Sequence, residues 1–308
     1  MSIISPDAGA VVHEAHPMAE EAPPTKRKGI GFLGWFSIAW LTLLVLAGAL
    51  ANFLPLDDPA AEVTTPKLAP MQEGHIFGAD ANGRDMLARV IFGARTSLII
   101  AVCAIGVGLI FGGTLGLLAG YFRNWVGNIL TSFFDILLAI PQLVLALSLV
   151  SVLKGDPSAE DGTHLSIVLI LVIALGLVSI PLLARITRAS TLSWSQREFV
   201  MAARAQGASH ARILWREILP NVAPAIMSIA LLGVAIAVVA EGGLAILGAS
   251  VEPPQATLGS LVATGKPDLT EAPFLVWIPV FAIFLTAASL NYLGDLVRDR
   301  FDVRESAL

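Results

Sequence analysis

Two acidic side chains stand inside long apolar runs of this chain, and they are the residues with the clearest potential for chemistry. Asp135 interrupts one run and Glu241 another. A carboxylate at membrane depth is costly, so it usually faces a bundle interior, a cavity or a pairing partner. Both acids are therefore candidates for lining a path across a membrane, with a structural hydrogen-bonding role as the alternative. The glycines between Glu241 and Gly248 favour a broken or re-entrant end of that run.

The remaining reactive residues do not form a catalytic or metal centre. The five histidines all stand in tails or loops: His13, His16, His75, His164 and His210. An enzyme needs His, Asp, Glu or Ser groups gathered at one level, and the sequence gathers none. The stretch Gly259–Lys266 lacks the spacing of a GxxxxGK[ST] phosphate loop and runs into Pro267. We therefore expect no catalytic residue, no metal ligand and no nucleotide site, and the single Cys103 excludes an internal disulfide.

The composition favours lipid as the surrounding solvent. Hydrophobic residues make up 56% of the 308 residues and charged residues 14%, with a mean hydropathy of +0.77. Soluble proteins of this length carry more charge. A net charge of −5 without a basic patch argues against nucleic acid as a partner. Six runs with at most one charged residue are long enough to cross a bilayer: 32–54, 96–120, 124–153, 165–184, 222–249 and 272–294. Because lipid excludes open strands, the sequence predicts an all-α, polytopic membrane protein with six transmembrane helices.

These runs divide the chain into segments and give it an orientation. The expected segments are a disordered cytoplasmic tail (1–28), a first transmembrane helix (29–54), an extracytoplasmic segment (55–95), a five-helix core (96–298) and a cytoplasmic tail (299–308). Thirteen Lys and Arg residues fall on the side of the two termini and six on the other, so both termini are expected in the cytoplasm. Three of the six lie within 84–95, which predicts an ordered amphipathic element beside the second run. A cleaved signal peptide is the alternative for the first run, whose apolar stretch exceeds the roughly 7–15 residues of a signal core.

Glycine and proline mark packing and bending inside the runs. A strict four-residue repeat in the second run gives a smooth helix face that another helix can approach closely: Gly108, Gly112, Gly116 and Gly120. A helix of this chain and a helix of a partner are both open as the neighbour. Pro141, Pro181 and Pro279 lie within the third, fourth and sixth runs, where proline frees a backbone carbonyl and kinks the axis. Hinges and static kinks are both open interpretations.

The loop between the fourth and fifth runs, 185–221, is the most informative stretch. Its first part is rich in alanine and ends at Gly207, a natural helix C-terminus. Ser209 is a suitable N-cap for a second short helix that runs to Leu219 and Pro220, where the next span begins. The pattern predicts two short helices with a glycine corner, forming a compact cytoplasmic knob. The alternative is an amphipathic elbow on the membrane surface.

This loop resembles the cytoplasmic loop of ABC importer permeases. The shared features are the pair Ala202-Ala203, then Gly207, and then Leu219-Pro220 with 13 positions from glycine to proline. The family usually has Glu before the paired alanines, whereas this chain has Met201, and Glu198 lies one turn earlier. In that family the loop inserts a coupling helix into a cleft of a separate ATPase. The resemblance assigns ATPase coupling to this set: Glu198, Ala202, Ala203, Gly207, Ala208, Ser209, Leu219 and Pro220.

The resemblance extends over residues 75–304. Segment 75–97 looks like the stretch before the second span of dipeptide and oligopeptide permeases, segment 241–254 like the stretch after the fifth, and 291–302 like the C-terminal end. At that end the family usually has a second glycine and a late proline, where this chain has Leu296 and Val303.

The resemblance implies a type I ABC importer permease in a bacterial inner membrane. It implies a second homologous permease, two ATP-binding subunits that carry ATP and Mg, and an extracytoplasmic substrate-binding protein. ATPase closure would rock the third to fifth spans. Dipeptides or oligopeptides are the expected cargo, with nickel, glutathione or haem as alternatives.

Two other classes of protein compete with this interpretation. An ion-coupled secondary transporter would favour paired intramembrane charges and an internal repeat, and the chain has two isolated acids and no evident repeat. The second competing class is a membrane enzyme or a structural scaffold. The sequence contains no cluster of reactive groups, which argues against an enzyme.

Overall fold

A computed structural model describes residues 30–72, 74–122, 124–155 and 165–305, with side chains described as far as residue 300. The expected disordered tail, 1–28, lies outside these residues. Within them the fold is all-α, as the sequence predicts, and the only β-type pairings are two isolated bridges. Five helices are long and apolar enough to cross a membrane: α1 (Phe32–Ala49), α2 (Met86–Tyr121), α5 (Ile167–Trp194), α8 (Leu219–Ile246) and α10 (Phe274–Glu305).

The third apolar run, 124–153, bends sharply at Pro141, where the sequence predicts a kink or a hinge. Helix α3 (Trp125–Ala139) and helix α4 (Gln142–Lys154) meet at about 90°. Pro141 is the N-cap of α4, so the missing proline N–H and the steric restriction on the preceding residue stop α3. If the bent pair is one span, the total is six. Pro181 and Pro279, in contrast, lie inside continuous helices.

Helix α2 begins ten residues before the predicted start of its run at residue 96. Asp85 caps it, because its side chain accepts a hydrogen bond of 2.7 Å from the Ala88 N–H. The predicted amphipathic element over 84–95 is therefore the first part of α2 itself, with Arg89 buried. The cap and the burial of this arginine explain the early start.

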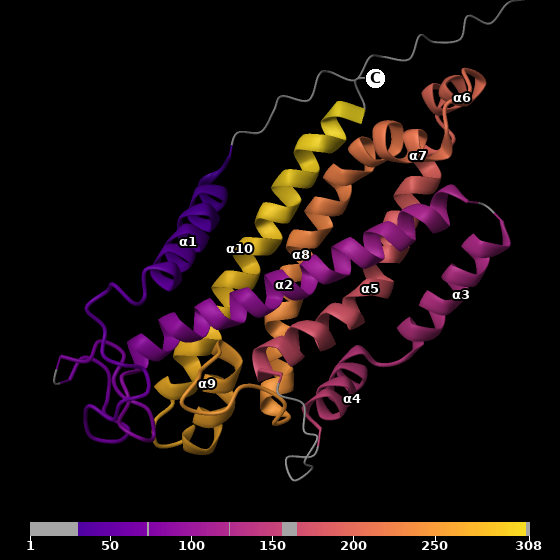
Figure 1. The fold of residues 1–308 in the computed structure, drawn as a ribbon. Helices are drawn as coiled ribbons and strands as arrows, with labels where there is room; N and C mark the ends of the chain where they lie inside the picture. The colour runs from indigo at the N-terminus through magenta and orange to yellow at the C-terminus, as the bar shows by residue number, and fades with distance from the viewer. Residues whose placement is uncertain (1–29, 73, 123, 156–164, 306–308) are drawn as a thin grey trace, which may run out of the picture.

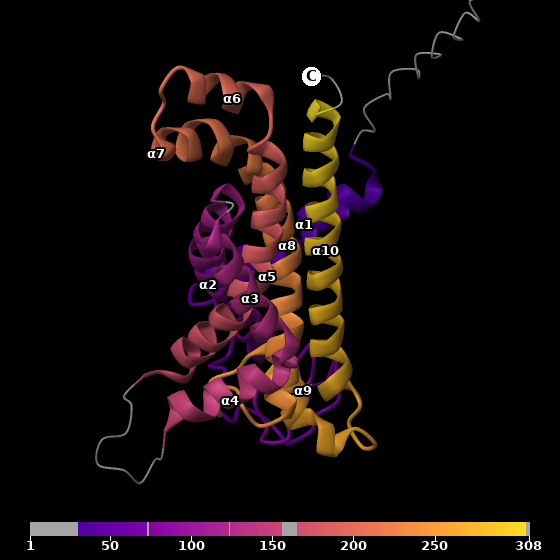
Figure 2. The same ribbon diagram turned by 90° about the vertical axis from the view of Figure 1, so that its right-hand side faces the viewer.

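The bundle has two distinct ends (Figures 1 and 2). Helices α6 (Glu198–Ala205) and α7 (His210–Arg212) project at one end, where the C-terminal end of α10 also lies. Helix α9 (Leu258–Gly265), the 3-10 turn η2 (Lys266–Asp268) and the segment before α2 lie at the other. We name these the α6 end and the α9 end. Helix α1 lies on the outside against α10, where Trp40 Nε1 donates to Thr286 Oγ1 at 3.2 Å.

The four glycines of α2 pack against α5 of the same chain. A Cβ atom at Gly112 would lie 2.5 Å from the Ile180 carbonyl oxygen, and one at Gly120 would lie 2.7 Å from the Arg188 carbonyl oxygen. At Gly108 and Gly116 a Cβ would meet Ser179 Oγ and the Ala184 carbonyl oxygen. The backbones of α2 and α5 therefore approach each other closely. The helix that packs on the glycine face belongs to this chain.

Candidate translocation surface and coupling loop

The loop after α5 folds into a helical hairpin whose corner is a glycine. Helix α6 ends in a Schellman motif, in which Ala208 N–H donates to Ala203 O and Gly207 N–H to Arg204 O, each at 3.0 Å. Gly207 has φ +80°, a left-handed conformation that glycine adopts without strain. Ser209 then caps α7 and accepts from the Arg212 N–H at 3.4 Å. The helix end at Gly207 and the N-cap at Ser209, both predicted from the sequence, are therefore present at this corner.

The second arm of the hairpin does not end before the next span. From His210 the chain is helical without a break to Ile246, passing through a π-helical segment, η1 (Ile213–Ile218), into α8. Pro220 lies in the first turn of α8 rather than at a boundary between two helices. A proline removes the hydrogen bond to the residue four positions earlier, and that residue, Arg216, lies in the wide π turn. The second short helix predicted over 209–219 is therefore present as α7 and η1, and it continues into α8 without an interruption.

The hairpin has a buried root and an exposed tip. Val200, Ile213 and Ile218 are fully buried against Leu117 and Tyr121 of α2. The residues assigned to ATPase coupling are mostly at the surface: Glu198, Ala202, Gly207, Ser209 and Pro220 are exposed, and Ala203, Ala208 and Leu219 are half-buried.

Large apolar side chains lie exposed on the hairpin. Phe199, Met201 and Trp215 are 38%, 54% and 63% exposed. Phe199 and Trp215 were not predicted from the sequence, although aromatic side chains in a loop between two apolar runs are a signal that could have identified them. An exposed apolar patch of this kind is typical of a protein-binding surface.

Helix α2 also contacts both arms of the hairpin. The Tyr121 hydroxyl lies 2.7 Å from His210 Nδ1, and the Arg204 guanidinium stacks over the Tyr121 ring at 5.2 Å. The ring of Phe122 meets His210 edge-on at 5.8 Å. The hairpin is therefore in contact with the C-terminal end of α2 and is continuous with α5 and α8.

A cavity of about 460 Å³ lies between α4, α5, α8 and α10. Ten of its twelve lining residues are apolar, and the two polar ones are Gln142 and Asn291. The sequence analysis missed both amides, because a single Gln or Asn in an apolar run gives no periodic signal. The lining of the cavity is uncharged, and the side-chain amides of Gln142 and Asn291 provide its hydrogen-bond donors and acceptors.

The two intramembrane acids lie outside this cavity. Glu241 is completely buried, and its carboxylate accepts hydrogen bonds from three hydroxyls: Ser97 Oγ at 3.1 Å, Ser250 Oγ at 2.8 Å and Thr257 Oγ1 at 2.6 Å. These contacts join α2, α8 and the N-cap of α9. A buried carboxylate that is fully hydrogen-bonded in this way holds the three elements in a fixed arrangement. The contacts therefore support the structural hydrogen-bonding role for Glu241. Asp135 is exposed on α3, about a turn before the break at Pro141.

One group of potential metal ligands comes together at the α9 end, although the sequence analysis expected none. Single ligand atoms of Asp57, His75 and Asp85 lie within 4.8 Å of one another. Both oxygens of Asp85 already have partners, His75 Nδ1 at 2.8 Å and the Ala88 N–H at 2.7 Å. The group is thus an extended cap of α2.

Comparisons with known proteins agree with this architecture. The family described as "Binding-protein-dependent transport system inner membrane component" matches residues 112–306. The dipeptide transport system permease protein DppC of Alkalihalophilus pseudofirmus is 32% identical over 286 residues, covering 93% of this chain and 90% of the relative. A putative peptide transport system permease protein of Brucella suis is 37% identical over 265 residues, covering 86% and 85%. The glutathione transport system permease protein GsiD of Pectobacterium atrosepticum is 34% identical over 228 residues, covering 74% and 72%.

A solved structure has the same fold. The inward-facing MetNI methionine ABC transporter aligns with a TM-score of 0.55 and 18% identity, covering 70% of this chain and 97% of that chain. The helical bundle, the projecting hairpin and the family match lead to one conclusion. This chain belongs to the binding-protein-dependent transport system inner membrane components, the membrane-spanning permease subunits of ABC importers.

Proposed function

We propose that the chain forms half of the translocation pathway of an ATP-driven importer for dipeptides or oligopeptides. The observation that carries this proposal is the α6–α7 hairpin, which projects beyond the bundle (Figure 2). Its side chains Phe199, Met201 and Trp215 are exposed. Such a surface fits a cleft in a separate ATPase subunit. A second homologous permease would supply the other half of the path, and two ATP-binding subunits would carry ATP and Mg.

The distribution of charge supports an orientation with the α6 end in the cytoplasm. That end carries the arginines of the 185–221 loop and of the C-terminal helix. At the α9 end, Arg84 and Arg89 are buried beside Asp80. They therefore contribute little to the Lys and Arg bias that determines membrane orientation. Both termini would then be cytoplasmic in a bacterial inner membrane, and the α9 end would face an extracytoplasmic substrate-binding protein.

The lining of the cavity favours peptides over the other cargoes. A nickel ion needs imidazole, carboxylate or thiolate ligands, and the cavity is lined by none among the described residues. Glutathione carries net negative charge, and no Lys or Arg lines the described cavity. Gln142 and Asn291 match the N–H and C=O groups of a peptide backbone and do not select for side-chain charge. The names of several relatives, which state dipeptide or peptide transport, point the same way.

Reconstitution tests the proposal directly. The complete importer in proteoliposomes, with its binding protein outside and ATP inside, should accumulate labelled di- or tripeptides. The permease chain without the ATPase subunits should not. Peptide uptake by this chain alone, driven by an ion gradient, would contradict the proposal and favour a secondary transporter.

A further inference from the structure

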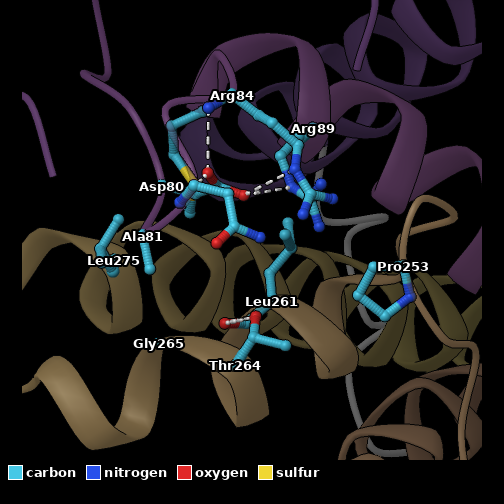
Figure 3. Close-up of a pocket in the computed structure, with 11 residues that line it drawn as sticks. Asp80, Ala81, Arg84, Arg89, Pro253, Leu261, Thr264, Gly265 and Leu275 are labelled. Atoms are coloured by element: carbon cyan, nitrogen blue, oxygen red, sulfur yellow. Dashed lines mark hydrogen bonds and ion pairs between the residues drawn. The ribbon is translucent and has the colours of Figure 1, made fainter. Parts of the chain in front are cut away.

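A small cavity at the α9 end has two buried arginines in its wall (Figure 3). Its volume is about 50 Å³, enough for a few water molecules or for one carboxylate group. Arg84 lines it from the segment just before α2, Arg89 from the first turn of α2, and Leu261 from α9. Asn82 and Thr264 also line it and are exposed, so a group from outside can enter between them.

The two arginines share a single acidic partner among the described residues. Arg84 Nε lies 3.7 Å and Arg89 Nε lies 3.4 Å from the same oxygen, Asp80 Oδ2. The other oxygen, Asp80 Oδ1, accepts from the backbone N–H groups of Asn82 and Arg84, at 2.8 and 2.9 Å. Because arginine stays protonated in proteins, two positive charges face one negative charge. One positive charge is left without a counter-charge.

Arg89 also has an unused donor. The residue is 2% exposed, and its buried Nε lies within ion-pair distance of Asp80 Oδ2 but forms no hydrogen bond to it or to any other described residue. Its Nη1 donates to the Pro59 carbonyl oxygen at 3.3 Å. A water molecule would accept a hydrogen bond without balancing the charge, and the last turn of α9 offers only a partial negative charge. An anion supplies both an acceptor and the missing charge.

We propose that this cavity, the carboxylate pocket, receives an acidic side chain of the extracytoplasmic binding protein. This inference rests on the proposed function, which places the α9 end on the side of that protein. A carboxylate is the anion whose geometry matches a guanidinium, and the pocket admits one such group rather than a whole ligand. Docking would complete the pairing of the two arginines.

The test changes the rim of the pocket and leaves both arginines in place. Replacing Arg89 would also leave Asp80 without its closest cation, so loss of folding would obscure the result. Asn82→Asp instead adds a carboxylate at the exposed rim, where it neutralises the pocket and repels an incoming acid. Affinity of the binding protein for the complete importer in nanodiscs should fall about tenfold or more, given the coupling measured for close charge pairs at interfaces.

Asn52→Asp is the matched control, because Asn52 is exposed after α1 and does not line the pocket. It makes the same chemical change and should bind as the wild type does. Equal affinity of the wild type and Asn82→Asp would overturn the inference while the proposed function stands. If the wild-type importer does not bind the binding protein at all, the proposed function itself fails.

A second arm separates a partner side chain from a free anion. The thermal midpoint of the importer without binding protein is measured against acetate concentration at constant ionic strength. The inference expects Asn82→Asp to lower affinity for the binding protein, whether or not acetate stabilises the wild type. Stabilisation that Asn82→Asp abolishes, with affinity for the binding protein unchanged, would identify a free carboxylate as the occupant and overturn the assignment to the partner.

Discussion

The packing of α2 on α5 predicts opposite effects of alanine at two neighbouring positions, Gly112 and Gly113. A Cβ atom at Gly112 would lie 2.5 Å from the Ile180 carbonyl oxygen and 3.1 Å from the Ala184 nitrogen, whereas one at Gly113 would meet nothing within 4 Å. Ordinary van der Waals contact begins near 3.4 Å. Gly112→Ala therefore requires the two helices to separate by about 1 Å, and overpacking of this kind costs about 1–3 kcal/mol.

Gly113→Ala should act in the opposite direction. An alanine in open space is favoured over glycine in a helix by up to about 1 kcal/mol. The free energy of unfolding of each variant is measured by denaturant titration of the purified chain in detergent micelles. We expect Gly112→Ala to be less stable than the wild type and Gly113→Ala to be equal to it or more stable. Equal stability of the two variants would refute the close backbone contact between α2 and α5.

Two further changes test the polar contacts of the α9 end. Glu241→Gln keeps an acceptor for the surrounding hydroxyls, so peptide uptake should stay within about twofold of the wild type, whereas Glu241→Ala should lose roughly 1–3 kcal/mol of stability by removing the acceptor. A large loss of uptake by a stably folded Glu241→Gln would show that the acid serves transport. Lys67 is paired with Asp268 at 2.7 Å and Glu271 at 2.8 Å, and these hydrogen bonds raise its pKa above the usual value. The stabilisation is fully present below the unfolded-state pKa of about 10.4 and is lost only as pH rises through the higher folded value. Protection factors of the amides around Lys67 should thus fall in Lys67→Met, and the ratio of wild-type to variant protection factors should be the same at every pH between 6 and 9; a ratio that changes with pH would contradict the pairing.

Much of the fold could be predicted because lipid imposes a simple rule on the sequence. The apolar runs, the glycine face of α2 and the glycine corner at Gly207 all follow from local composition and spacing. The break at Pro141 was visible as a kink, but its angle depends on how α3 and α4 pack. The early start of α2 was harder to predict, because Arg84 and Arg89 look like loop residues until Asp80 is placed beside them.

The site was predicted less completely than the fold. The glycine corner of the 185–221 loop could be predicted from its motif, whereas its role in ATPase coupling stays a prediction; the structure adds the buried root of the hairpin and the contact of Tyr121 with His210. The two acids attracted attention because charge is rare in lipid, yet the cavity is lined by the neutral amides Gln142 and Asn291. Which residues of separate helices meet around a cavity depends on tertiary packing, and neither spacing nor composition encodes it.

The central claim is that the hairpin at the α6 end couples this permease to an ATPase, and a pair of glycine variants tests it most directly. Gly207 and Gly248 both have φ +80° and both have open space around the position of a Cβ atom. Valine at either position imposes a similar backbone strain, but at opposite ends of the bundle. The measurement is the amount of ATPase subunit that copurifies with the membrane-inserted permease. The account predicts that Gly207→Val loses most of the ATPase while Gly248→Val retains it. Equal retention by the two variants would contradict the coupling role of the hairpin.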